Sequence, residues 1–135
     1  MSDRSTPISE GIKKFTIDTA TDWMEWSGTA LADVANEDDD SDMKLGAVGF
    51  TRAPAGVSST FDFAYDEVLV ITKGACTIRS DDRAVTARAG EVVYLPAHVP
   101  GTFHADMDVE LVYVASSPYG RVNREAKAAL LHERR

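Results

Sequence analysis

The sequence predicts an all-β fold, either a β-sandwich or a β-barrel, with one short helix near its C-terminal end. From residue 45 onward, short blocks rich in Val, Ile, Thr, Tyr and Phe follow one another at short intervals, as strands do. Turn residues separate the blocks at positions 53–56, 81–83 and 89–90. Helical periodicity is confined to the end of the chain, so alternating β and α units are not expected.

The expected strands differ in their patterns. Residues 67–74 have apolar side chains at both odd and even positions, which is typical of a central strand that is covered on both faces. In residues 75–80, apolar and polar side chains alternate. Residues 13–18 alternate Phe15 and Ile17 with polar residues and predict a short edge strand. The remaining strands are expected at 45–52, 59–65, 84–90, 91–96 and 109–116.

The two ends of the chain are expected to differ in structure. Residues 1–11 are polar and predict a flexible N-terminus, and residues 12–135 predict a single domain. Residues 121–133 predict a helix, because four apolar residues recur on one stripe. These residues are Val122, Ala126, Ala129 and Leu130.

Composition excludes several classes of protein. The chain has 135 residues, 44% of them hydrophobic, but no window approaches the roughly 18 apolar residues of a membrane span. The net charge of −8 would repel a phosphate backbone, and the single cysteine, Cys76, excludes an internal disulfide. The start of the chain has no apolar signal core. We expect a cytoplasmic protein with no nucleic-acid and no membrane partner.

Two local clusters are expected to have structural roles. Trp23 and Trp26 fit one face of a helical turn or the mouth of a barrel, and closing the core is the favoured role. The acidic run from Glu37 to Asp42 predicts a solvated loop, because its charges repel one another. It does not complete a calcium-binding EF-hand, since Met43 replaces the required glycine.

The spacing of glutamate, glycine and proline resembles the cupin family. The first cupin motif ends E-x6-G, as do Glu67 and Gly74, and the second begins G-x5-P, as do Gly90 and Pro96. The resemblance covers about residues 44 to 117. It implies a cupin-type jelly-roll β-barrel with a short C-terminal helix, and a homodimer, which this fold often forms.

The cupin metal site is not preserved in this sequence. The two histidine positions of the first motif fall on Phe61 and Phe63, and the third histidine position falls on Gly101. Of the usual ligands only Glu67 remains, whereas a tightly held metal needs about three or four donors. We therefore expect no metal and no cofactor.

Within the cupins, residues 61–100 and 110–120 are similar to the ethanolamine-utilisation cupins of the EutQ type. This resemblance implies a link to ethanolamine breakdown, in which the group has been proposed to act as acetate kinases. The chain has no G-x4-G-K-[ST] phosphate loop. No phosphate site is therefore visible in the sequence.

The candidate site is centred on Glu67. Alternate residues of a strand share one face, so Phe61, Phe63, Tyr65 and Glu67 are expected to point together into the barrel. A carboxylate among aromatic rings suits an ammonium or small amine, and burial would also raise its pKa into the range of an acid or base. In the alternative interpretation, Phe61 and Phe63 simply fill the barrel.

Further side chains complete the predicted site. His98 and His104 are expected near the same mouth, as catalytic partners of Glu67. Tyr94 and Tyr113 either line the pocket or pack in the core.

Three functional hypotheses remain open at this stage. The first is a small-molecule-binding protein of amine metabolism, with Glu67 and the aromatic strand as receptor. The second is an isomerase, lyase or cyclase that uses Glu67 as acid or base. The third is a metal-dependent cupin with an unusual ligand set: Glu67, His98, His104 and Asp62 or a tyrosine.

Overall fold

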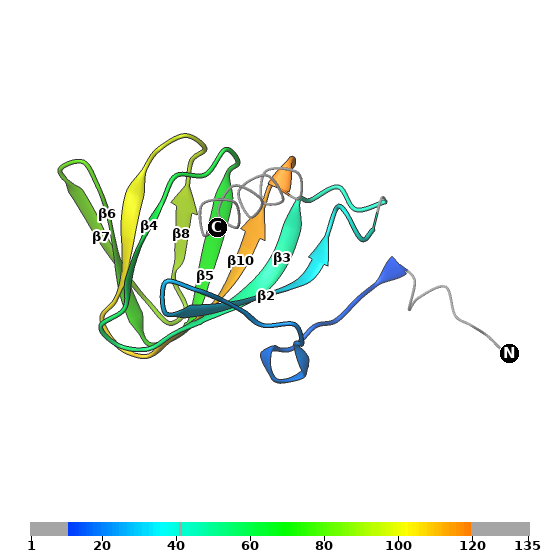
Figure 1. Cartoon of the computed structure of the whole chain (residues 1–135), viewed down its shortest axis with the longest axis horizontal. Coiled ribbons are helices and arrows are strands. Elements are labelled where there is room, and N and C mark those ends of the chain that lie inside the picture. The colour runs from blue at the N-terminus through cyan, green and yellow to red at the C-terminus, as the bar shows by residue number, and fades with distance from the viewer. Residues whose placement is uncertain (1–10, 41, 120–135) are drawn as a thin grey trace, which may run out of the picture.

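The protein consists of two antiparallel β-sheets that face each other (Figure 1), in a computed structural model that describes residues 11–40 and 42–119. One sheet has six strands in the order β1-β2-β3-β10-β5-β8, and the other has four in the order β4-β9-β6-β7. The strands of the larger sheet are β1 (Met24–Trp26), β2 (Thr29–Asn36), β3 (Ala47–Ala53), β5 (Glu67–Lys73), β8 (Val92–Leu95) and β10 (Val109–Ala115). The smaller sheet contains β4 (Ser58–Phe61), β6 (Ala75–Ser80), β7 (Arg83–Arg88) and β9 (Gly101–Ala105).

The core lies between the two sheets. In β3 and β10 every second residue is buried, so one face of the larger sheet points to the smaller sheet and the other points outward. Ile71 on β5 and Leu111 on β10 are 1% and 2% exposed at the centre of the core. Cys76 is fully buried there, and burial raises the pKa of its thiol to about 11, which favours the unreactive thiol form.

The two predicted glycine turns have the backbone that the cupin motifs require. Gly74 has a φ of 80° between β5 and β6, and a Cβ there would lie 2.0 Å from the carbonyl oxygen of Asp108. Gly90, the first residue of the second motif, has a φ of 91°, in the left-handed region that glycine favours. The alignment of this chain with the motifs therefore agrees with its backbone.

The fold differs from the sequence prediction in its closure. The predicted closed barrel is wrong, because the two sheets form separate hydrogen-bonded ladders and meet through side chains. The predicted strand at residues 13–18 is also wrong. A single 3-10 turn, η1 (Ile17–Thr19), forms there instead, because the Thr16 side chain accepts a hydrogen bond from the Thr19 amide and caps it. The predicted helix at 121–133 lies outside the described residues.

Three strands were not predicted from the sequence. The residues of β1 are all exposed, so they show no alternation of burial, and they include Trp26. Strand β2 directly precedes the acidic run, and the whole segment was interpreted as a loop. Strand β9 begins with glycine and has only two buried residues, so its pattern is weak. Trp23 precedes β1, and the Arg52 guanidinium lies 4.8 Å from the centre of its ring.

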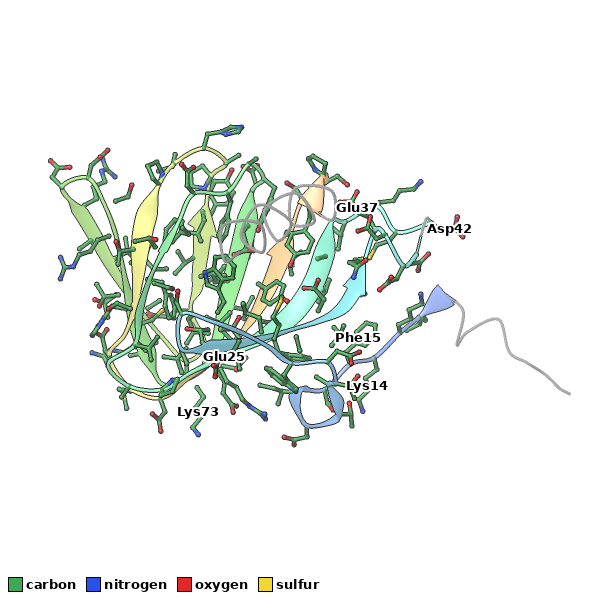
Figure 2. All side chains as sticks on the ribbon, viewed as in Figure 1. Lys14, Phe15, Glu25, Glu37, Asp42 and Lys73 are labelled. Atoms are coloured by element: carbon green, nitrogen blue, oxygen red, sulfur yellow. The ribbon has the colours of Figure 1, made fainter. Side chains whose placement is uncertain are left out.

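The described residues of the acidic run, 37–40 and 42, lie in the expected loop after β2. Figure 2 shows Glu37 and Asp42 at the end of the molecule where this loop projects beyond the sheets. The Asn36 side chain accepts hydrogen bonds from the Asp38 and Asp39 amides, which fixes the turn. No helix among residues 11–40 and 42–119 has the length and apolar character that crossing a membrane requires.

Candidate functional site

Glu67 lies on the inner face of the larger sheet, at the start of β5. It is paired between Ala115 of β10 and Leu95 of β8, and it points to the same side as Leu69. Its side chain is enclosed, because the residue is only 7% exposed. A carboxyl group is therefore present in an apolar interior, where burial disfavours its charged form.

Three aromatic rings stack in sequence beside this carboxyl group. The ring centres of Phe61 and Phe63 are 5.5 Å apart, and those of Phe63 and Tyr65 are 4.9 Å apart. Tyr119 meets Tyr65 edge-on at 5.0 Å, and both pack in one cluster with Ala115, the strand neighbour of Glu67. The three alternate aromatic side chains, Phe61, Phe63 and Tyr65, therefore share one side. Phe63 and Tyr65 lie beyond the end of β4, in residues 62–66, which connect β4 of the smaller sheet to β5 of the larger sheet. We call this connecting segment the aromatic strap.

Backbone amides from two other segments donate hydrogen bonds to this strap. The amide of His98 donates to the carbonyl of Phe63 at 2.7 Å, and the amide of Ala97 donates to the Asp66 carboxylate at 2.8 Å. On the other side, the amide of Ser116 donates to the Asp66 carbonyl at 2.9 Å. The turn at residues 97–98, which follows Pro96, and the end of β10 therefore hold the aromatic strap in place.

A second carboxylate, Asp33 on β2, reaches the same inner face. Its Oδ1 accepts hydrogen bonds from the Tyr113 hydroxyl and, at 2.9 Å, from the Tyr119 hydroxyl. Asp33 and Tyr113 are on strands separated by β3, and Gly49 is the β3 residue paired with both. A Cβ at Gly49 would lie 2.2 Å from the Tyr113 hydroxyl, so only a glycine lets the tyrosine ring cross β3.

Burial sets the protonation of this group of side chains. Burial, and then the negative charge of Asp33, raise the pKa of Glu67 to about 8. Burial is also the largest cause that raises the pKa values of the Tyr113 and Tyr119 phenols. Near neutral pH, the site therefore contains a largely protonated Glu67 and two neutral phenols that donate to Asp33.

Other predicted site residues lie elsewhere in the structure. Tyr94 is 58% exposed and is paired with Val68, so it lies on the outer face of the larger sheet. His104 lies on the outer face of the smaller sheet, because its neighbours Phe103 and Ala105 point inward. His98 meets the strap through its backbone, while the residue itself is exposed. The core clusters that contain Phe61, Phe63, Tyr65 and Tyr113 also contain Ala115 and Leu95, the two strand neighbours of Glu67. Tyr94 and His104 lie on the outer faces, away from these clusters.

The residues around Glu67 do not fit a cupin metal. Phe61 and Phe63 occupy the positions of two histidine ligands and stack on each other. Within residues 11–40 and 42–119, no three His, Cys, Asp or Glu side chains gather closely enough to hold a metal ion. His104, which the alternative ligand set requires, lies on the other sheet and faces away from the core.

Comparison with solved structures identifies the class of fold. An RmlC-like cupin from Shewanella frigidimarina superposes with a TM-score of 0.66 at 11% identity, over 82% of this chain and 96% of that chain. A protein of unknown function from Rhizobium leguminosarum superposes with a TM-score of 0.64 at 28% identity, over 78% of this chain and 96% of that chain. The EutQ protein of Clostridium difficile gives a TM-score of 0.58 at 20% identity, over 65% of this chain and 61% of that chain. The two sheets therefore form a cupin fold.

The sequence match is more specific than the fold. The pattern of the family described as ethanolamine utilisation protein EutQ matches residues 11–119. The chain belongs to the EutQ family of cupins. A comparison with curated proteins finds no match.

Sequence reasoning missed two residues of the site, Asp33 and Tyr119. A signal was present for Asp33, since Leu31 and Asp33 alternate with two alanines at the start of the acidic segment. That alternation predicts a strand, and β2 forms there. Tyr119 follows the last strand after two serines and a proline, and no local pattern marks it as part of the interior.

Proposed function

We propose that the protein binds a small primary amine of the ethanolamine class at the inner face of the larger sheet. The observation that carries this proposal is a pair of carboxyl groups, Glu67 and Asp33, in which the charge of Asp33 acts on Glu67. Asp33 accepts a hydrogen bond from Tyr119, whose ring meets Tyr65 of the aromatic strap. Asp33 supplies a negative charge that would pair with an ammonium group. The family description supports the choice of ethanolamine as the first ligand to test.

Amine binding is expected to release a proton from Glu67. Its pKa of about 8 keeps the carboxyl group mostly protonated at pH 7, and an ammonium placed beside it would lower that pKa. Each amine bound should therefore displace close to one proton. This behaviour distinguishes a site at Glu67 from binding to exposed carboxylates, because those are already charged at this pH.

Titration calorimetry with ethanolamine at pH 7 tests the proposal. The heat of binding should depend on the ionisation enthalpy of the buffer in the parent, because a proton is released. Glu67→Gln should lose that dependence and bind at least about tenfold more weakly, which corresponds to roughly 1.4 kcal/mol. The exposed Glu25 gives a matched control, since Glu25→Gln should leave affinity and proton release unchanged. Equal affinity in the parent and in Glu67→Gln would refute an amine site at Glu67.

A second candidate function is acid–base catalysis by Glu67 on a small ligand. The raised pKa favours it, because a carboxyl group that titrates near pH 8 can both donate and accept a proton at physiological pH. Tyr113 and Tyr119 would hold a substrate or Asp33 in position through their hydroxyls. A Glu67→Gln variant that binds a substrate but no longer turns it over would select catalysis over binding alone.

We also propose a homodimer formed through the outer face of the larger sheet. Two rows of uncharged side chains cross this face from β3 to β8, and Val92 and Tyr94 at its edge are 61% and 58% exposed. The rows are Val48, Val114, Val68 and Tyr94, and Phe50, Val112, Val70 and Val92. The net charge of −8 makes two copies of the chain repel each other over most of their surface. An uncharged face avoids this repulsion, so it is the surface on which a second copy would pack under two-fold symmetry.

The dimer proposal predicts that Val92→Glu yields monomers at micromolar concentration. A glutamate placed beside its symmetry mate would be desolvated and repelled. Sedimentation velocity of the parent and the variant measures the change. Val85→Glu, at a valine of β7 that is 52% exposed, is the control and should remain dimeric. A parent that sediments as a monomer would exclude the proposed interface.

A further inference from the structure

A serine, a histidine and an aspartate lie in contact on the outer face of the smaller sheet, away from Glu67. The pairing of β4 with β9 places Ser58 opposite His104. The Ser58 hydroxyl lies 2.6 Å from Nδ1 of His104. On the other side of the ring, Nε2 of His104 lies 3.8 Å from a carboxylate oxygen of Asp106. The imidazole therefore lies between a hydroxyl and a carboxylate.

Neighbouring strands fix the aspartate. The pairing of β6 with β9 places Thr77 opposite His104, on the side away from Ser58. The Thr77 hydroxyl donates a 2.6 Å hydrogen bond to Oδ2 of Asp106 and lies 2.9 Å from the hydroxyl of Thr86. One oxygen of Asp106 is held by Thr77, while the other, Oδ1, faces the imidazole.

This arrangement selects the tautomer of His104. A carboxylate next to Nε2 favours a proton on that nitrogen, which leaves the lone pair of Nδ1 directed at the Ser58 hydroxyl. Ser58 is then the donor in the 2.6 Å hydrogen bond. Either nitrogen of a neutral imidazole can act as the base. A serine hydroxyl that is hydrogen-bonded to Nδ1 is therefore activated in the same way as one that is hydrogen-bonded to Nε2.

The contact lies in a hollow that a small molecule can enter. The hollow has a volume of about 310 Å³ and is lined by Ser58, Thr77, Arg79, Thr102, His104 and Asp106. Arg79 is exposed and is paired with Thr102, one row along the same face from His104. It supplies a positive charge in this hollow, where a reaction that develops negative charge on an oxygen would be stabilised.

We propose that Ser58, His104 and Asp106 form a nucleophilic site that accepts the acyl group of a small activated ester or thioester. The Ser58 Oγ attacks the carbonyl carbon while its proton passes to Nδ1 of His104. Collapse of the tetrahedral intermediate breaks the bond to the leaving oxygen or sulfur, which takes the proton from His104 and leaves an acyl-serine. Water then attacks with His104 as base, and the carboxylic acid and free Ser58 result. Asp106 orients the imidazole and stabilises its charged form, and Arg79 stabilises the carbonyl oxyanion.

Reaction of the whole protein with p-nitrophenyl acetate tests this site. Release of p-nitrophenolate gives the rate, and peptide mass spectrometry locates the acetyl group. We expect acetylation of Ser58, no adduct at this position in Ser58→Ala, and a roughly hundredfold slower reaction of Ser58 in His104→Gln. Ser59→Ala is the matched control, because Ser59 is the next residue of β4, is paired with the buried Phe103, and should leave the rate unchanged.

Two results would overturn the proposal. One is acetylation confined to lysines or the N-terminus, and the other is acetylation of Ser58 at the parental rate in His104→Gln. Ser58 and Asp106 are exposed and His104 is half-buried, so these substitutions leave the core intact. Circular dichroism of each variant confirms the fold before the rates are compared. Asp106→Asn should slow the reaction by about tenfold or more, because the imidazole loses the charge that stabilises its protonated form.

Discussion

Replacing Glu67 with glutamine is expected to stabilise the protein at alkaline pH relative to the parent. The folded state raises the pKa of Glu67 from 4.5 to about 8, so its contribution to stability is fully present below pH 4.5 and is lost as the pH rises through 8. The full loss is up to about 5 kcal/mol, since each pKa unit corresponds to about 1.36 kcal/mol. Glutamine is neutral at every pH and does not incur this loss.

Urea unfolding of the parent and of Glu67→Gln between about pH 5 and about pH 9 measures this difference. The free energy of unfolding of the variant minus that of the parent should increase with pH across this range. Glu25→Gln, at an exposed glutamate of β1, should show a difference that does not follow this curve. A difference between Glu67→Gln and the parent that stays constant with pH would show that Glu67 ionises as easily in the folded state as in the unfolded one.

Replacing Gly49 with alanine is expected to destabilise the protein by about 2 to 4 kcal/mol, through overpacking and loss of a partly buried hydrogen bond. The new Cβ would lie 2.2 Å from the ring and hydroxyl of Tyr113 and 2.6 Å from the carbonyl oxygen of Ala32. The carbonyl belongs to the paired β2 strand and cannot move aside, so the tyrosine ring must leave its place. Its hydrogen bond to Asp33 would then be lost.

Chemical unfolding at fixed pH measures this cost. Gly11→Ala is the control, since a Cβ at Gly11 meets no atom within 4 Å, and it should change stability by less than about 0.5 kcal/mol. The double variant Gly49→Ala with Tyr113→Leu should cost less than the sum of the two single changes, because the first change acts through the tyrosine ring. A Gly49→Ala protein as stable as the parent would contradict the role assigned to this glycine.

Much of the fold follows from patterns within short segments. Strand β5 was predicted because its residues are apolar at both parities, and burial alternates along it between the core and the outer face. The stacking of Phe61, Phe63 and Tyr65 follows from their spacing at every second residue. The rings stay on one side even beyond Phe61, where the pairing of β4 with β9 ends. Such features depend on neighbours in sequence, so sequence reveals them.

The candidate site was predicted only in part. Glu67 was identified by its place in a motif, and its pKa of about 8 agrees with the burial expected from its aromatic neighbours. His104 was placed with it wrongly, because nearness in sequence to His98 does not determine which sheet a strand joins. Strand β9 pairs with β4 and β6, and this pairing turns His104 toward Ser58 rather than toward Glu67.

The sequence by itself determined that the chain is mainly β, where its central strands and glycine turns lie, and that aromatic rings replace the histidines of a cupin metal site. The tertiary structure decided that the sheets remain unclosed and that Asp33 joins Tyr113 across Gly49. The physical reason is that strand order and register are settled by packing among distant segments. Asp33 and Tyr113 are 80 residues apart in sequence, so no local pattern predicts their contact.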